Sequence, residues 1–439
     1  MASSANRPST DDVIAAALSR CLEEHVTQGQ TLCVAYSGGL DSTVLLDALA
    51  HLLQGGAAFQ LRAVHVDHGL SPHAKTWATH CTAVCGGLGV PLHVEPVVVV
   101  NRGGGVEAAA RDVRYRILDR QAADWILLAH HREDQAETLM LNLLRGAGVH
   151  GAAGMPEIRG RYLRPLLDVP RWELRKYALE HKLTWVEDES NASDALSRNF
   201  LRNQVIPQLQ ARFPAATQTL ARMAQRCREA SSLLDQLAIL DGAGRDPLDL
   251  QGMQALGRDR AANALTTFLR RHDLPIPGQR WFDNLLEQLL SAADDTSIRV
   301  CLAGRELRVF RHALWIVVPD VPPDKEISWQ GETPLSWGEG AITAHRAKGS
   351  GVRATAAANT LSFRRRRGGE RMRLHAQGPR RPLKDLLRES GMPPWRRNSI
   401  PLLFAGEELI WVPGVGIAGE WRCLPDEDGI YIEFSGPNW

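Results

Sequence analysis

Residues 32–46 constrain the fold most strongly, because an apolar run stops at a Gly-Gly turn and an apolar-periodic segment begins directly after it. The pattern predicts a strand, a tight turn and a helix. Gly38 and Gly39 lack a Cβ, so the turn can adopt positive φ and approach a ligand closely. Asp41 and Ser42 are good helix caps. The free N–H groups of the new helix would face the turn and suit an anion, while the alternative is a Gly-Gly turn that serves geometry alone.

Alternating strand and helix patterns surround this turn. Strands are predicted over 31–36, 61–66, 91–100, 125–129 and 183–186, and helices over 13–27, 42–53, 73–88, 106–122, 132–144 and 171–181. The alternation predicts an α/β fold with a doubly wound parallel sheet. Ligands of such sheets lie beyond the carboxyl ends of the strands, where the Ser37 turn, residues 65–69 and the pair His130-His131 fall.

The length of 439 residues is enough for two to four domains. We expect a catalytic domain over 1–214, a mostly helical connector and docking domain over 215–320, a linker over 321–360 and a small α+β domain over 361–439. Within the second of these, helices are predicted over 220–240, 260–271 and 281–290, with apolar strands over 298–302 and 314–318. A last helix is predicted over 383–389.

Composition excludes several classes of protein. No stretch of about 18 uncharged apolar residues is present, so we expect no membrane span. Residues 1–12 are polar and lack the pattern of a signal peptide, which by default indicates the cytoplasm. The seven cysteines contain no Cys-x-x-Cys pair, which argues against a disulfide framework and a zinc ribbon. Cys81 and Cys85 share an apolar helical face and are expected to be buried.

The net charge of +1 conceals a basic segment at 361–400, where 12 Lys/Arg stand against 3 Asp/Glu. The segment therefore carries +9, and the rest of the chain, with 39 Lys/Arg against 47 Asp/Glu, carries −8. Such a segment points to a polyanionic partner, while a solvated charged face is the alternative. Its cations are Arg364–Arg367, Arg371, Arg373, Arg380, Arg381, Lys384, Arg388, Arg396 and Arg397, and Phe363 and Trp395 lie among them as rings for base stacking.

Three clusters of polar residues in the first 214 residues could carry chemistry. His130, Asp134 and Glu137 share one helical face that could hold a divalent cation or a substrate amine, or could simply be a capped helix start. Glu107 and Arg111 are four residues apart and form either a surface ion pair or an arginine held for phosphate. Arg198, Asn199 and Arg202 fit either a solvated helix start or a phosphate-binding edge. Spacing alone leaves each alternative open.

Taken together, the segments resemble the tRNA(Ile)-lysidine synthetase family of the PP-loop ATP pyrophosphatase superfamily. The resemblance is carried by Ser37–Ser42, His65–Leu70, Glu107-x3-Arg111-x2-Arg114-Tyr115, Ala129–Thr138, Leu143–Gly146, Arg164–Leu167, Glu187-Asp188-x-Ser190-Asn191 and Arg198-Asn199-x2-Arg202. Gly368–Arg371, Leu383-Lys384-x-Leu386 and Pro393-x-Trp395-x-Arg397 look like the C-terminal domain of that family. No motif could be matched in residues 241–360.

The resemblance implies that ATP adenylates C2 of the cytidine at the first anticodon position of a CAU-anticodon tRNA(Ile), and that lysine then replaces AMP. It implies ATP and Mg²⁺ as cofactors, with Asp41 and Asp134 at the metal; a homodimer is a further expectation. Nucleotide binding is implied for Ser37, Gly38, Gly39, Leu40, Asp41, Ser42, His65 and Asp67, and catalysis for Asp41, Arg111, His130, Asp134 and Glu137. Substrate binding is implied for Glu107, Arg114, Arg198, Asn199 and Arg202, and tRNA binding for Arg364, Arg365, Arg371, Arg373, Lys384, Arg396 and Arg397.

Two other functions stay open at this point. A PP-loop tRNA thiolase would have the same nucleotide loop, but that class generally needs reactive or cluster-binding cysteines. A non-catalytic tRNA-binding protein could keep the nucleotide fold without the reaction. ATP-dependent incorporation of lysine into tRNA separates all three.

Overall fold

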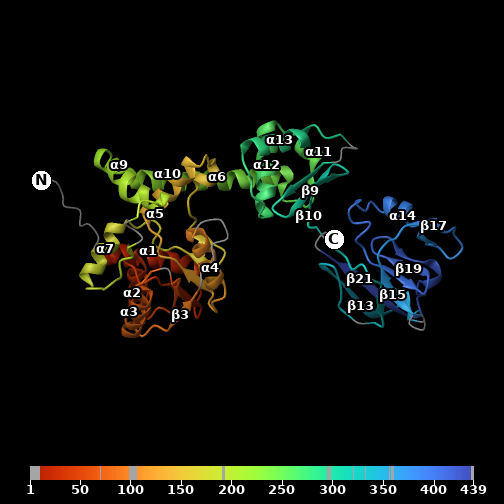
Figure 1. The fold of residues 1–439 in the computed structure, drawn as a ribbon, viewed down its shortest axis with the longest axis horizontal. Coiled ribbons are helices and arrows are strands. Elements are labelled where there is room, and N and C mark those ends of the chain that lie inside the picture. The colour runs from red at the N-terminus through yellow and green to blue at the C-terminus, as the bar shows by residue number, and fades with distance from the viewer. Residues whose placement is uncertain are drawn as a thin grey trace. The chain divides into compact units, whose positions relative to one another are not determined.

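The computed structural model describes residues 10–69, 71–97, 106–189, 193–293, 298–319, 321–331, 333–354, 356 and 360–436, with the backbone alone at 10–12 and 106–108. The chain divides into two compact units, Met1–Leu233 and Leu234–Trp439 (Figure 1). Each unit has its own sheets and its own apolar clusters.

The first unit contains one six-stranded sheet with the order β3-β2-β1-β4-β6-β5. Its strands are β1 Thr31–Ala35, β2 Gln60–Asp67, β3 Leu92–Pro96, β4 Trp125–Leu127, β5 Ile158–Arg159 and β6 Tyr162–Leu163. All neighbours pair in parallel except β5 and β6, which are antiparallel. The chain proceeds outward from β1 to β3 and then returns to the other side of β1, so the strand order reverses between β1 and β4. Such a switch point is where open α/β sheets bind ligands.

Helices pack on both faces of this sheet, as the doubly wound pattern predicts. The helices of the first part of the chain are α1 Thr10–His25, α2 Leu40–Gln54, α3 Ala74–Leu88, α4 Val106–Asp119, α5 Arg132–Leu144, α6 Val149–Ala152, α7 Arg171–Glu180, α8 Ser197–Phe200, the π-helix η2 Leu201–Val205, α9 Ile206–Arg212 and α10 Ala216–Ala238. Of these, α5, α6 and α10 share a separate small apolar cluster. Successive residues of β1 point to opposite faces. Leu32 and Val34 pack in the cluster formed with α1, α2, α3 and α7, while Cys33 packs in the cluster formed with α4.

The second unit combines a helical part with antiparallel sheets. Its first part contains the π-helix η3 Ile239–Ala243, α11 Leu250–Gln254, α12 Arg258–Arg271 and α13 Gln279–Leu290, with the sheet β7-β10-β9-β8 formed by β7 Leu248–Asp249, β8 Arg299–Leu302, β9 Arg305–Phe310 and β10 Ala313–Val317. The remainder contains β11 Ile327–Trp329, β12 Leu335–Trp337, β13 Gly340–Lys348, β14 Val352–Arg353, β15 Leu361–Arg364, β16 Arg371–Met372, β17 Arg381–Pro382, α14 Leu383–Glu389, β18 Leu402–Ala405, β19 Glu408–Val412, β20 Gly416–Ile417, the 3₁₀ turn η5 Gly419–Trp421 and β21 Asp428–Ser435.

The sequence prediction of a doubly wound sheet is confirmed, and two local predictions differ from the structure. Residues 183–186 form no strand, although the Val186 N–H donates a hydrogen bond to Gly38 O at 2.9 Å. The expected linker at 321–360 contains β11–β14: β11 pairs with β15, β12 with β13, and β13 and β14 with β21. The Gly- and Ala-rich composition of this segment favours a linker. Its strands form because they pair with distant strands, and such pairing leaves no local pattern in the sequence. Of the strand predicted at 91–100, residues 98–100 lie outside the described part.

Cys81 and Cys85 are buried on α3, as predicted from their apolar face. Across the described residues, no helix combines the length and apolar character needed to span a membrane.

Candidate active site

The loop between β1 and α2 is a tight turn held by its own hydroxyl groups. Ser42 Oγ donates to Gly39 O at 3.0 Å and lies 3.0 Å from Ser37 Oγ, while Gly39 N–H donates to Ser37 Oγ at 3.3 Å. Gly39 is the N-cap of α2, and among the described residues no side chain caps this helix. The first N–H groups of a helix lack partners within it, and the helix dipole favours negative charge there. The turn is therefore built to receive an anion.

Gly38 is required by the geometry of this loop. Its φ is +82°, a conformation that L side chains rarely adopt, and a Cβ at this position would lie 2.8 Å from Cys81 Sγ. Because Cys81 is fully buried on α3, its sulfur cannot move aside freely. The loop backbone thus packs against α3.

The start of α5 places His131 among three carboxylates. His131 is the N-cap residue, and its backbone N–H donates to Asp134 Oδ2 at 3.0 Å. Its ring Nε2 lies 3.4 Å from Asp134 Oδ2 and 3.7 Å from Asp41 Oδ2, and its Nδ1 lies 3.1 Å from Glu133 Oε2. Asp41 follows β1 and His131 follows β4, so this contact joins the segments that follow the two strands.

The two neighbouring histidines have opposite electrostatic surroundings. Burial works against the charged ring of His131, but the carboxylates of Asp134, Glu133 and Asp41 outweigh it and raise the pKa of His131. Burial lowers the pKa of His130 to about 3, against the opposing attraction of Asp134. The surroundings therefore favour the charged ring at His131 and the neutral ring at His130.

Arg171, the first residue of α7, completes this cluster. Its Nε lies 3.5 Å from Asp41 Oδ1, and its backbone N–H donates to Glu133 Oε2 at 2.9 Å. Asp41 Oδ1 is buried and makes no hydrogen bond to any described residue. A buried carboxylate oxygen without a hydrogen bond is a suitable oxygen ligand for Mg²⁺.

Asp134 and Glu137 bind two arginines from the segment that follows α7. Arg198 contacts Glu137 Oε2 through Nε at 2.7 Å and Asp134 Oδ1 through Nη2 at 2.9 Å. Arg202 contacts Glu137 Oε1 through Nε at 2.6 Å and Asp134 Oδ1 through Nη2 at 2.9 Å. Although burial acts to raise it, the charges of His131 and Arg198 hold the pKa of Asp134 well below its usual range. These four side chains form one nearly closed network of charges.

Three other residues predicted to bind nucleotide or substrate lie outside the cluster around His131. His65 is buried, with Nδ1 2.9 Å from Tyr36 O, and Asp67 Oδ1 accepts the N–H of Gly69 at 2.9 Å. Asn199 is also buried and donates to Ser193 O at 2.9 Å. These contacts support the ends of strands and loops, and none of them belongs to the cluster around His131.

The arginines of α4 lie on an exposed face of that helix. The guanidinium carbon of Arg111 lies 5.1 Å from the centroid of the Tyr115 ring. Arg114 Nε is 3.4 Å from His68 Nε2, a residue of the segment after β2. Burial, with a contribution from Arg114, lowers the pKa of His68 to about 4. The side chain of Glu107 lies outside the described part, so the expected pair with Arg111 is not described.

Sequence reasoning missed His131 and Arg171. The sequence prediction counts helical spacing from His130, which puts His130, Asp134 and Glu137 on one face of the helix. Counted in this way, His131 does not lie on that face. His131 precedes α5 as its N-cap, where the chain is extended, so helical spacing does not apply to it. The signal available in the sequence was the position of both histidines directly after a strand. Nothing local to Arg171 indicates its approach to Asp41, because the two are 130 positions apart.

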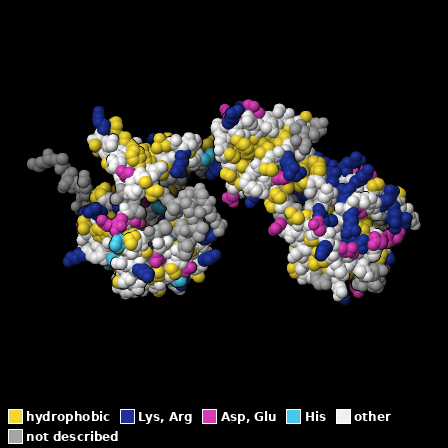
Figure 2. All heavy atoms as spheres, in the orientation of Figure 1, with side chains coloured by type: hydrophobic (Ala, Val, Ile, Leu, Met, Phe, Trp, Pro, Cys, Tyr) yellow, Lys and Arg dark blue, Asp and Glu magenta, His cyan; other side chains and the backbone are white. Residues whose placement is uncertain are grey.

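The basic segment of the second unit is partly neutralised by local ion pairs. Arg364 contacts Glu326 at 2.9 Å and Glu407 at 3.2 Å, Arg373 contacts Glu420 at 2.7 Å, and Arg365 pairs with Asp324. Figure 2 shows Lys and Arg side chains gathered over the region of α14 and β19, with acidic side chains among them. Arg371 and Lys384 are exposed there.

The aromatic residues expected among these cations do not form an open stacking surface. Phe363 is fully buried in the core of the β-sheets, which corrects its expected role in base stacking. Trp395 is half-buried, with the guanidinium carbon of Arg308 5.3 Å from its ring centroid. Arg396 lies over the ring of Trp315 at 5.0 Å, and Arg397 Nε donates to Met392 O at 2.8 Å.

The glycine loop at the switch point and its uncapped helix define the class of the first unit. Residues 11–209 match the PP-loop domain family, residues 248–315 the TilS substrate binding domain and residues 361–434 the TilS substrate C-terminal domain. The first unit is thus a PP-loop domain, as its motifs predict.

Relatives identify the family more closely. A protein of Nitrosomonas europaea described as tRNA(Ile)-lysidine synthase is 37% identical over 427 residues, covering 94% of this chain and 93% of the relative. A protein of Alkalilimnicola ehrlichii with the same description is 40% identical over 407 residues, covering 90% and 91%. A third, from Azoarcus sp., is 38% identical over 408 residues, covering 91% and 90%. The chain belongs to the tRNA(Ile)-lysidine synthase family.

Proposed function

We propose that the protein is an ATP-dependent ligase that joins lysine to C2 of cytidine 34 in the CAU-anticodon tRNA(Ile). In the first step, the C2 oxygen attacks the α-phosphate of ATP and pyrophosphate leaves. In the second, the lysine amine attacks C2 and AMP leaves with that oxygen, giving lysidine. The observation that carries the proposal is the anion-binding turn at Gly38 and Gly39, which faces the cluster around His131 in a chain of this family.

The PP-loop would bind the leaving pyrophosphate. Backbone N–H groups at the start of α2, from Gly39 and Leu40 onward, and the hydroxyls of Ser37 and Ser42 are suitable donors for its oxygens. Arg171 and His131, whose charged form is favoured by the neighbouring carboxylates, lie beside Asp41 and would balance the charge that develops there, a role not expected from the sequence. Electrostatic stabilisation of this kind contributes about 3–4 kcal/mol per donor.

Asp41 fits Mg²⁺ better than Asp134 does. Asp41 Oδ1 makes no hydrogen bond to a described residue, whereas both oxygens of Asp134 already accept hydrogen bonds from backbone or arginine. When bound, the ion would neutralise phosphate charge. We therefore assign the metal to Asp41 and give Asp134 a different partner.

That partner is the substrate lysine. Free lysine carries a positive α-ammonium and a negative α-carboxylate. The network already pairs the same two kinds of charge, because the guanidinium groups of its arginines contact its carboxylates; its members are Asp134, Glu137, Arg198 and Arg202. The α-ammonium would replace an arginine at the carboxylates, and the α-carboxylate would take up the released guanidinium. The neutral His130 beside this network would accept a hydrogen bond from an amine without adding charge.

The second unit would bind the tRNA backbone. Arg364, Arg365 and Arg373 already have acidic partners, so the exposed Arg371 and Lys384 are better candidates for contacts to phosphate. The positions of Arg396 and Arg397 against their own unit favour a structural role for them. A cytoplasmic location and a homodimer stay predictions of the sequence.

The cysteines argue against the thiolase alternative. Six of the seven are buried and Cys301 is exposed. Burial raises the pKa of Cys81 to about 12 and that of Cys85 to about 11, so neither thiol ionises readily at neutral pH. A thiolase would need reactive cysteines near the nucleotide.

The experiment combines purified protein, ATP, labelled lysine and the cognate tRNA. We expect lysine to enter the tRNA with release of AMP and pyrophosphate. ADP and phosphate as products, or release of AMP without incorporation of lysine into tRNA, would refute the proposal. A tRNA whose first anticodon base is uridine is the matched control, and it should accept no lysine.

A further inference from the structure

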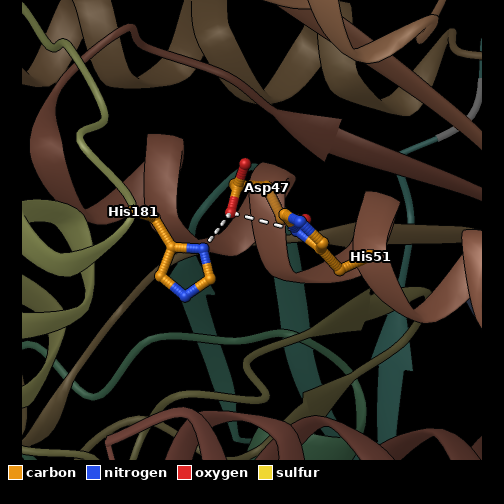
Figure 3. Close-up of side chains that lie close together, drawn as sticks. All are labelled: Asp47, His51 and His181. Atoms are coloured by element: carbon orange, nitrogen blue, oxygen red, sulfur yellow. Dashed lines mark hydrogen bonds and ion pairs between the residues drawn. The ribbon is translucent and has the colours of Figure 1, made fainter.

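Asp47, His51 and His181 form a cluster of possible metal ligands in the first unit (Figure 3). Asp47 and His51 are one turn apart on α2, and His181 is the C-cap of α7. Along the helix axis, Asp47 and His51 lie about 9 and 15 Å beyond Asp41. The cluster is therefore separate from the nucleotide site, although both lie on the same helix.

The spacing of the three ligand atoms suits a tetrahedral ion. His51 Nδ1 lies 3.2 Å from Asp47 Oδ2, His181 Nδ1 lies 3.8 Å from the same oxygen, and all three atoms are within 4.8 Å of one another. Ligands at the bond lengths of Zn²⁺ are about 3.3 Å apart in a tetrahedron. Movements of the two imidazole rings by about 1.5 Å at most would bring all three distances to that value.

The donor set points to a transition metal rather than to Mg²⁺. Two imidazole nitrogens and one carboxylate oxygen are typical of zinc sites that keep a water as fourth ligand, whereas Mg²⁺ prefers oxygen alone. The side chain of Asp47 is 4% exposed, so its charge is buried and a cation would compensate it. The side chains of His51 and His181 are 52% and 25% exposed, which gives an ion and a water access from solvent.

Tyr177 supports two of the ligands. Its hydroxyl donates to Asp47 Oδ2 at 2.9 Å, and its ring stacks on the His181 ring with centroids 4.0 Å apart. Partners of this kind fix the orientation of metal ligands. His51 Nδ1 also lies 3.0 Å from Asp47 O, and binding of an ion would replace that contact and leave the ring proton on Nε2.

We propose that Asp47, His51 and His181 bind one transition-metal ion of the zinc class. The ion would link α2 to α7. Both helices begin at the candidate active site, where Arg171 Nε lies 3.5 Å from Asp41 Oδ1, and they lie side by side as far as the cluster. The site thus fixes the spacing of the two helices that bring Arg171 to Asp41, a property beyond the proposed reaction.

The test measures binding of Zn²⁺ to the full chain after removal of metal by a chelator. We expect one Zn²⁺ per chain by calorimetry, and visible absorption bands of tetrahedral Co²⁺ when Co²⁺ is added instead. His51→Gln and His181→Gln should each weaken Zn²⁺ binding by more than about 100-fold, since loss of a supporting partner alone costs 10–100-fold. Both variants replace partly exposed side chains, and circular dichroism confirms that each is folded.

Two matched controls identify the site. His25→Gln removes the histidine of the other candidate cluster in the described residues, Glu24, His25 and Glu157, where Glu157 already pairs with Arg20 at 3.2 Å. His93→Gln removes an exposed histidine whose Nε2 lies 2.9 Å from Glu95. Both should bind Zn²⁺ as the wild type does. Absence of Zn²⁺ binding in the wild type, unchanged binding in both His51→Gln and His181→Gln, or loss of binding in His25→Gln would each overturn the proposal.

Discussion

Replacing Gly38 by alanine tests whether the nucleotide loop is held in place by α3. The new Cβ would occupy a residue with φ of +82° and would lie 2.8 Å from Cys81 Sγ and 3.1 Å from Val186 Cγ2. Two separate penalties follow. The left-handed conformation costs an alanine about 1–2 kcal/mol, and overpacking against a buried side chain costs about 1–3 kcal/mol.

We therefore expect Gly38→Ala to lower the free energy of unfolding by about 2–5 kcal/mol. Gly29→Ala is the matched control, because Gly29 has a similar φ of +86° and nothing lies within 4 Å of its added Cβ. It should cost only the backbone penalty of about 1–2 kcal/mol. The difference between the two variants measures the contact with Cys81 and Val186.

Urea denaturation of the metal-free chain gives the stabilities, and exchange of pyrophosphate into ATP in the presence of tRNA reports the loop itself. In the double variant Gly38→Ala/Cys81→Ala, removal of the sulfur should recover part of the lost stability relative to Cys81→Ala alone. Equal destabilisation by Gly38→Ala and Gly29→Ala, or no recovery in the double variant, would refute the argument that α3 holds the loop in position.

Four further predictions follow from the described contacts. Asp41→Asn should abolish formation of the adenylate but preserve tRNA binding in a filter assay; equal loss of both would contradict its role at the phosphates. The pKa of Asp134 is lower in the folded chain than its value of about 3.9 in the unfolded chain. Its ionised form therefore stabilises the fold at any pH above the unfolded pKa, and this stabilisation is lost as pH falls through the folded pKa. Asp134→Asn should thus lower Tm at pH 7, and its difference from the wild type should shrink in acid; a constant difference would contradict the ion pairs. In the native chain, one thiol of seven, that of Cys301, should react rapidly with a disulfide reagent, and several rapid thiols would contradict the burial of the others. Lys384→Ala should reduce the salt slope of tRNA binding by about 1, whereas Arg364→Ala, which removes a paired arginine, should leave the slope unchanged; the reverse order would refute the proposed interface.

The fold of the first unit could be predicted because its strands alternate with amphipathic helices and its turn residues are local. The strand before Ser37 and the helix after it follow from apolar pattern and glycine alone. Pairing between distant segments could not be predicted in this way. The Val186 N–H donates to Gly38 O, 148 positions away in the chain, and β5 and β6 are two residues each, too short to leave a periodic signal.

The candidate site could be predicted to the extent that it lies at strand ends. Asp41 and Asp134 follow from the turn and from the spacing after His130. The partners that set their charge come from elsewhere: Arg171 begins α7, and Arg198 and Arg202 lie more than 60 positions beyond the carboxylates they contact. Only the folded chain brings these charges together, so their exact pairing has no signature in the sequence.

The pairing of β13 with β21 determines the order in which the chain can fold during synthesis. In this antiparallel pair Ala341 lies opposite Ser435 and Lys348 lies opposite Asp428. The paired residues are up to 94 positions apart in the chain. The six-stranded sheet of the first unit is complete at β6, long before β13 emerges from the ribosome. The nucleotide-binding unit can therefore fold while β13 still lacks β21, and until β21 is made one edge of β13 stays open to pairing with another chain.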